Sequence, residues 1–184
     1  MQLNFFSDIS PVQNNLAYLF TRTNTLTHKP SFTSLYKNSP GHLILLHGPL
    51  HWFAGRQIST AQSTAEAEIY STNECARDFM NLRHIISDLN LSDTLAPGPT
   101  PIYNDNMACV HWCHNKSNRS MRHIQIRENL VRETIQNDTV SVTHVRGKIN
   151  PADLLTKEQK DTTHFIQLRN FILSPPPVMS TSVH

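Results

Sequence analysis

Four acidic residues that are far apart in the chain each lie where a strand is expected to end or a helix to begin. Asp8 ends one short apolar run, Asp105 follows another, and Asp153 lies just after Pro151, where a helix is expected to start. The fourth acid, Glu68, lies early in a long expected helix. Taken singly, such an acid is usually a cap or a solvated surface group. If the four gathered, their mutual repulsion would require bound cations.

Glu68 is the acid whose orientation the sequence defines best. It belongs to a stripe of residues spaced three and four apart, whose other members are mostly apolar: Ala65, Thr72, Cys75, Phe79, Leu82 and Ile86. Helical geometry therefore turns the Glu68 carboxylate inward. Glu66 lies about 200° away around the helix, so the two acids cannot face one site. The alternative for Glu68 is a buried ion pair with an arginine.

A cluster of carboxylates implies a particular chemistry. Oxygen-rich acidic sites suit hard ions such as Mg²⁺ or Mn²⁺. Two such ions about 3.5–4 Å apart can activate a water for in-line attack on a phosphodiester and stabilise the departing oxygen. The leading reaction class is therefore phosphodiester hydrolysis with two Mg²⁺ or Mn²⁺ ions, and no small-molecule cofactor is expected.

The elements that would position these acids alternate between strand and helix patterns. Strands are predicted at residues 3–8, 42–46, 51–54, 101–103 and 139–145, and helices at 62–89, 107–114, about 124–135 and 151–173. This order predicts an α/β protein with a mixed five-stranded sheet flanked by helices. In such sheets the carboxyl ends of strands and the first turns of helices converge on one crevice.

The chain is expected to form one domain over residues 1–173, followed by a disordered, proline-rich tail at 174–184. Within the domain, residues 10–40 contain three prolines and no sustained periodicity, so they are predicted to be a long irregular connection.

The spacing of the cysteines and the distribution of apolar residues indicate where in the cell the chain is expected. The three cysteines lack a framework spacing, which favours a reducing compartment, the cytoplasm or nucleus. No signal-peptide pattern and no apolar stretch of roughly 20 residues is present, so neither secretion nor a membrane location is expected.

Positive charge is concentrated in one part of a chain whose formal net charge is only +2. Residues 114–148 hold seven lysines and arginines against three acids. Such a segment can follow the phosphates of a nucleic acid without reading its sequence, although a solvated helix face is the plainer alternative. Asn104 and Asn106 could contact ribose 2′-hydroxyls. The full predicted set is Asn104, Asn106, Lys116, Arg119, Arg122, His123, Arg127 and Lys148.

Two other groups of residues are better explained by structural roles than by metal or base binding. The set Cys109, His111, Cys113 and His114 has no second ligand pair at zinc-finger spacing, so positions on a short helix explain it better than a metal does. Trp52 and Trp112 are interpreted as core or sheet-packing aromatics rather than base-stacking platforms.

Four segments, in order, resemble motifs of the ribonuclease H domains of copia-type retrotransposon polyproteins. Ser63-Thr64-Ala65-Glu66-Ala67-Glu68-Ile69-Tyr70 resembles the Ser-Ser/Thr-Thr-Glu-Ala-Glu-Tyr signature, and Tyr103-Asn104-Asp105-Asn106 resembles Tyr-x-Asp-Asn. Arg122-His123-Ile124-Gln125-Ile126-Arg127 is similar to Lys/Arg-His-Ile-Asp-Ile-Arg. Asn150-Pro151-Ala152-Asp153-Leu154-Leu155-Thr156-Lys157 resembles the closing Ala-Asp-x-x-Thr-Lys segment.

The resemblance implies a ribonuclease H-like fold, an RNA/DNA hybrid as substrate, and a reverse transcriptase in the same polyprotein as partner. It assigns Glu68, Asp105 and Asp153 as metal-binding catalytic acids. The family takes a further aspartate from its opening strand, for which Asp8 is the candidate.

The chain departs from the family pattern at its first motif, where Ser7-Asp8-Ile9-Ser10 replaces an Asp-Ala-Asp-Trp type of sequence. Some ribonucleases H have a histidine in the loop that corresponds to residues 147–151. This loop contains none here, and Lys148 could supply positive charge in its place. A catalytically inactive descendant that keeps the fold, and with it some nucleic-acid binding, is therefore the alternative function. An integrase or transposase is disfavoured because Glu68 lies on the first long helix rather than the last.

Overall fold

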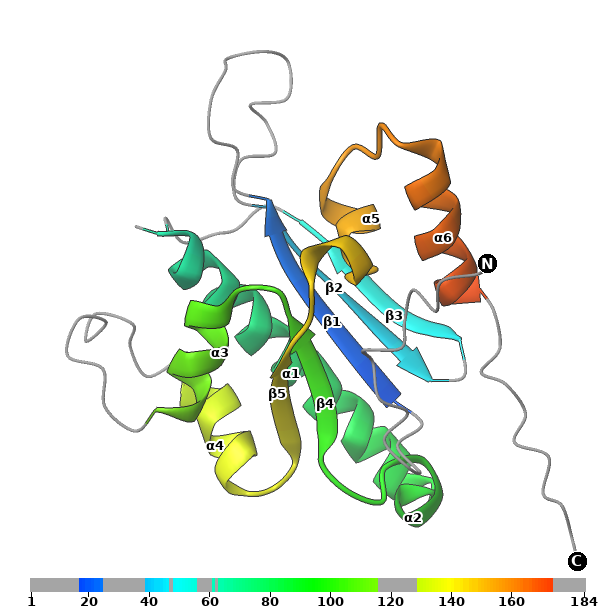
Figure 1. Cartoon of the computed structure of the whole chain (residues 1–184). Helices are drawn as coiled ribbons and strands as arrows, with labels where there is room; N and C mark the ends of the chain where they lie inside the picture. Colours follow the sequence, from blue (N-terminus) through cyan, green and yellow to red (C-terminus); the bar gives the residue numbers. More distant parts are fainter. Residues whose placement is uncertain are drawn as a thin grey trace, which may run out of the picture.

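A mixed β-sheet organises this computed structural model, which describes residues 17–24, 39–46, 48–55, 61, 63–115 and 129–173. The strands are β1 (Ala17–Asn24), β2 (Ser39–Leu46), β3 (Pro49–Ala54), β4 (Thr100–Asn104) and β5 (Val140–His144). Their order across the sheet is β3-β2-β1-β4-β5. The first three strands pair antiparallel, whereas β4 runs parallel to both β1 and β5. The carboxyl ends of β1, β4 and β5 therefore share one edge (Figure 1).

Helices cover both faces of this sheet (Figure 1). One face packs against α1 (Thr64–Asp88), α3 (Met107–His114) and α4 (Leu130–Gln136). The other face carries the 3₁₀ turn η4 (Gly147–Ile149), α5 (Asp153–Thr156) and α6 (Thr162–Leu173). A short helix, α2 (Ser92–Leu95), follows α1. In the described part of the chain, none of the helices combines the length and the hydropathy of a membrane-spanning segment. The predicted α/β class, a mixed sheet flanked by helices, is confirmed.

Side-chain alternation on β2 divides the core between the two faces, as strand geometry requires. Ile44 packs with Phe79 of α1 and Trp112 of α3, whereas Leu43 and Leu45 pack on the side of α5 and α6. Burial on both faces explains why the segment from Leu43 to Leu45 is continuously apolar.

The first described strand differs from the prediction. Residues 3–8, predicted as the opening strand, lie outside the described residues, as does the tail at 174–184. Strand β1 instead lies within residues 10–40, which were predicted to be an irregular connection. Its eight residues include Tyr18, Phe20 and Thr21, types that favour strands, and β2 and β4 pair with it on both sides and supply the ladder hydrogen bonds. Tertiary pairing therefore decides this strand.

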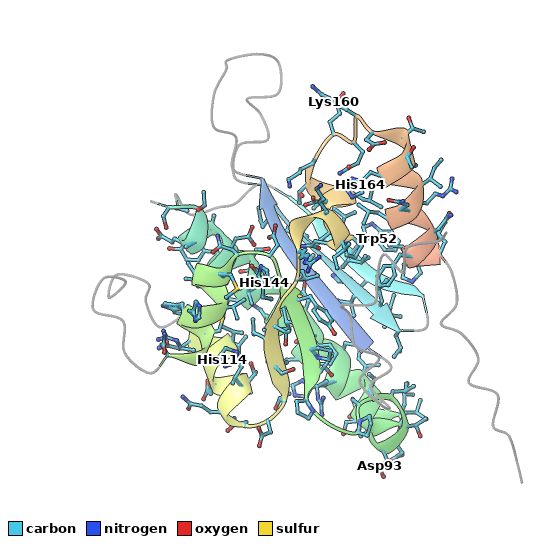
Figure 2. All side chains as sticks on the ribbon, viewed as in Figure 1. Trp52, Asp93, His114, His144, Lys160 and His164 are labelled. Carbon is cyan, nitrogen blue, oxygen red and sulfur yellow. The ribbon has the colours of Figure 1, made fainter. Side chains whose placement is uncertain are left out.

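Two further predictions were wrong in part. The helix predicted over 151–173 is divided into α5 and α6, with Lys157 in an extended conformation at the end of α5. Trp52 does not belong to the core, since it lies on the edge strand β3 and is 61% exposed (Figure 2). Trp112 is buried as predicted, and the Arg132 guanidinium lies 3.7 Å above its ring.

All three cysteines are free and buried in the core. Burial raises the pKa of Cys75, and a hydrogen bond with Cys113 together with burial raises the pKa of Cys109. For both thiols the pKa in the folded chain exceeds the value in the unfolded chain, so ionisation favours unfolding. The stability associated with the neutral thiols is therefore complete below the unfolded pKa and decreases as the pH rises above about 8.5.

We therefore expect the native chain to show no rapidly reacting thiol at neutral pH, and three in denaturant. The urea midpoint should also fall as the pH rises above about 8.5, and Cys75→Ala should reduce that fall. Thiol titration and urea unfolding at several pH values test both points. A rapidly reacting cysteine in the folded chain would contradict this description of the core.

Candidate active site

A buried hydrogen-bond network joins α1 to the carboxyl end of β4. Asn104, the last residue of β4, donates from Nδ2 to Glu68 Oε2 at 3.0 Å and to Thr72 Oγ1 at 3.0 Å. The Thr72 hydroxyl in turn donates to the Glu68 carbonyl at 2.8 Å, one helical turn back. All three side chains are buried, with Asn104 completely so. The network therefore fixes the Glu68 carboxylate against the end of the central sheet.

The start of α1 is more buried than the stripe pattern indicated. Ser63 caps the helix by accepting a hydrogen bond from the Glu66 amide at 3.1 Å. Glu68 is 5% exposed and faces inward as predicted, but Glu66 is only 3% exposed. The Tyr70 hydroxyl donates to Glu66 Oε1 at 2.8 Å. Two carboxylates are therefore buried on different sides of one turn, where a single inward acid was expected.

Asp105 lies immediately after β4, between two asparagines whose side chains have structural roles. Asn104 Oδ1 accepts from the Asn106 amide at 2.7 Å. Asn106 Oδ1 caps α3 by accepting from the amides of Ala108 and Cys109 at 3.0 and 3.2 Å. These bonds define the backbone on both sides of Asp105, whose side chain is half-buried. Asp105 therefore follows directly on the residue that holds Glu68.

Asp153 begins α5, which packs against β1 and β2 on the other face of the sheet. It is 5% exposed, and Lys157 Nζ lies 3.1 Å from its Oδ2. Asn150 Oδ1 accepts from the Ala152 amide at 3.1 Å and orders the turn before it. Within the described residues, the acids Glu68, Asp105 and Asp153 do not form a set whose ligand atoms all lie within 4.8 Å. The network links Glu68 to Asn104, the residue before Asp105, whereas Asp153 lies at the start of α5.

The fourth predicted acid, Asp8, lies outside the described residues. The central strand β1 contains neither aspartate nor glutamate. Its register pairs Thr21 with Asn104. The next residue of β1 after this pair is an arginine, Arg22, as Asp105 is the next residue after β4.

The predicted nucleic-acid contacts comprise five residues outside the described part of the chain, the exposed Lys148, and two asparagines. Lys116, Arg119, Arg122, His123 and Arg127 lie outside the described residues. Lys148 is exposed on η4, and its carbonyl oxygen lies 2.6 Å from His164 Nε2.

The asparagines are used within the fold. Asn104 is completely buried and its amide is bonded to Glu68, so it does not fit a contact with ribose. Asn106 is half-buried and serves as the α3 cap.

His144 is a residue of this edge that the sequence analysis missed. It ends β5, pairs in register with Asn104, and is exposed (Figure 2). The signal was available in the sequence, because parallel strands β4 and β5 must end together and place His144 beside the Asp105 end of β4.

Replacing Asn104 tests whether the network positions Glu68. Asn104→Ala removes the two donated bonds and leaves buried acceptors, so we expect a loss of about 1–3 kcal/mol of unfolding free energy. Asn104→Asp should be worse, because it places a second negative charge beside Glu68. Urea unfolding measures both. An Asn104→Asp protein as stable as the wild type would contradict the described network.

The fold is shared with ribonuclease H. The structure of LC11-RNase H1, isolated from compost by a metagenomic approach, matches with a TM-score of 0.50 at 12% identity, covering 77% of this chain and 92% of that one. No family model matches the sequence.

Sequence comparison identifies relatives among retrovirus-related Pol polyproteins of plant transposons. RE1 of Arabidopsis thaliana is 29% identical over 124 residues, RE2 of the same plant is 28% identical over 127, and TNT 1-94 of Nicotiana tabacum is 27% identical over 123. Each match covers 66–68% of this chain but only 8–9% of the polyprotein. The resemblance to copia-type ribonuclease H domains is thereby confirmed.

Proposed function

We propose that this chain is the ribonuclease H domain of a copia-type polyprotein and hydrolyses the RNA strand of an RNA/DNA hybrid. The observation that carries the proposal is the hydrogen bond from Asn104 to Glu68. It joins the acid of the α1 motif to the end of β4, where Asp105 follows, on a sheet with ribonuclease H order. Glu68 and Asn104, which lie 36 positions apart and belong to two different motifs, therefore meet at one edge of the sheet.

The donor set fits a hard divalent cation. Glu68, Asp105 and Asp153 offer carboxylate oxygens, the ligands that Mg²⁺ and Mn²⁺ prefer. When bound, such ions activate a water and stabilise the charge on the departing oxygen. This chain's own contribution is to fix Glu68 through Asn104, to deliver Asp105 at the strand end, and to present Asp153 from α5. Asp8 is the remaining candidate ligand.

The hybrid would lie along the edge where β4 and β5 end. His144 and Lys148 are exposed there, and the basic segment from Lys116 to Arg127 follows α3 in sequence. Cationic contacts of this kind supply affinity for phosphates that is independent of sequence. A reverse transcriptase domain of the same polyprotein would produce the hybrid, in the cytoplasm or nucleus.

Cleavage of a hybrid labelled on its RNA strand tests the proposal. We expect cutting in Mg²⁺ or Mn²⁺ by the wild type, its abolition by EDTA, and strong loss in Asp105→Asn and Asp8→Asn. A matched single-stranded RNA should remain uncut by all proteins, which excludes a contaminating ribonuclease.

A second candidate is a domain that binds hybrids without cutting them. The absence of any acid from β1, in which Arg22 follows the residue that pairs with Asn104, specifically favours it. In this case all three proteins would show the same background cleavage, while still shifting a hybrid in EDTA. Equal background cleavage together with no binding would contradict both candidates.

A further inference from the structure

A second cluster of ligand side chains lies on the α1 face of the sheet, two strands across from the carboxyl end of β4, since Thr21 of β1 pairs with both His42 and Asn104. His42 of β2, His51 of β3 and Asp78 of α1 each offer an atom, and these atoms all lie within 4.8 Å of one another. Asp78 Oδ2 lies 3.0 Å from His42 Nε2 and 3.4 Å from His51 Nε2. The two imidazole rings are 5.5 Å apart, between centroids. Three separate elements thus converge on one point.

The central residue of this cluster is buried without hydrogen bonds. His42 is 1% exposed, and within the described residues neither of its ring nitrogens makes a hydrogen bond, despite the approach of Asp78. Phe53 stacks on the ring with centroids 5.5 Å apart, which excludes water from that side. A buried polar atom without a partner is costly. A metal ion accepting the Nε2 lone pair would remove part of that cost.

The distances fit tetrahedral coordination. With zinc bonds of about 2.0–2.1 Å, tetrahedral ligand atoms are separated by about 3.3 Å. The separations of Asp78 Oδ2 from the two histidine Nε2 atoms, 3.0 and 3.4 Å, bracket this value. Two imidazoles with one carboxylate form a zinc-type donor set, since Mg²⁺ prefers oxygen. His51 and Asp78 are 47% and 34% exposed, so a fourth ligand can come from water.

We propose that His42, His51 and Asp78 form a Zn²⁺ site that fastens the β2–β3 hairpin to α1. The ion would bridge the edge strand β3, which is exposed along its whole length, to the helix that carries Glu68. This site is separate from the carboxylates of the proposed nuclease centre and stands whether or not the chain cleaves hybrids.

Zinc titration of the whole chain, freed of metal with EDTA, tests this site. His51→Ala and Asp78→Asn alter partly exposed positions, so they should fold, which circular dichroism checks. His111→Ala removes an exposed histidine of α3 and is the matched control. We expect calorimetry to show a Zn²⁺ site in the wild type and the control, with affinity at least tenfold lower in His51→Ala and Asp78→Asn.

Spectroscopy and melting give independent readouts. Co²⁺ should give the visible absorption of a tetrahedral site in the wild type but not in His51→Ala, and Zn²⁺ should raise the melting temperature of the wild type more than that of either variant. Equal affinities in all four proteins, or an equal loss in His111→Ala, would show an adventitious ion only and overturn the proposal.

Discussion

Replacing Glu68 with glutamine is expected to reduce metal-dependent cleavage of an RNA/DNA hybrid by about 100-fold or more. Glutamine keeps an oxygen that can accept the Asn104 amide, so the 3.0 Å hydrogen bond and the fold should survive. It removes the negative charge that a divalent ion requires, and loss of about 3 kcal/mol of transition-state stabilisation corresponds to roughly 100-fold in rate. Initial rates on a labelled hybrid, with thermal melting of both proteins, measure the effect.

Glu66→Gln is the matched control, because Glu66 is equally buried but bonded to Tyr70 rather than to the end of β4. We expect its cleavage rate to remain within a few-fold of the wild type. If Glu68→Gln cleaved as fast as the wild type, Glu68 would not be a metal ligand. Equal losses in the two variants would indicate a general effect of perturbing the first turn of α1.

Replacing Phe79 with alanine is expected to cause the largest loss of stability, about 3–5 kcal/mol. Phe79 is completely buried and lies in the core cluster where α1 meets Ile44 of β2 and Ile102 of β4. Its removal leaves a cavity beneath the helix that carries Glu68, which α3 and α4 can fill only in part.

Urea unfolding measures this loss, with Leu89→Ala as a control at a position 62% exposed. The control should change the unfolding free energy by less than about 1 kcal/mol. A Phe79→Ala protein as stable as Leu89→Ala would contradict the described core.

Elements whose stability is signalled locally could be predicted from the sequence. The helix α1 has both a serine cap at Ser63 and a long buried stripe, and α3 begins with the Asn106 cap. The hairpin of β2 and β3 has Gly48 just before β3 and Pro49 as the first residue of β3, and this Gly-Pro pair is a local turn signal. In each case residues close in sequence make the defining interactions.

Elements that depend on distant residues could not be predicted in the same way. Strand β1 gains its hydrogen bonds from β2 and β4 on either side. The burial of Glu66 reflects tertiary packing around the whole first turn of α1, which a one-faced stripe does not capture. The division between α5 and α6 had a local signal that was overlooked, since Asp161 caps α6 by accepting from the amides of Thr163 and His164.

In the candidate site, too, local features could be predicted and contacts between distant residues could not. Glu68, Asp105 and Asp153 were predicted as site residues from their positions at element ends and from the resemblance to a family, and they remain a prediction. It assigned Asn104 to the substrate, whereas the structure uses its amide to hold Glu68. That contact joins residues 36 positions apart, so only the folded chain reveals it.

A crystal structure of the chain with Mn²⁺ and an RNA/DNA hybrid is the most direct test of the central claim. The anomalous signal of manganese locates each ion independently of the surrounding protein. We predict Mn²⁺ bound by Glu68 and Asp105, with Asp153 facing the same ions and the RNA strand against them. A hybrid bound elsewhere, or manganese absent from these carboxylates, would contradict the account.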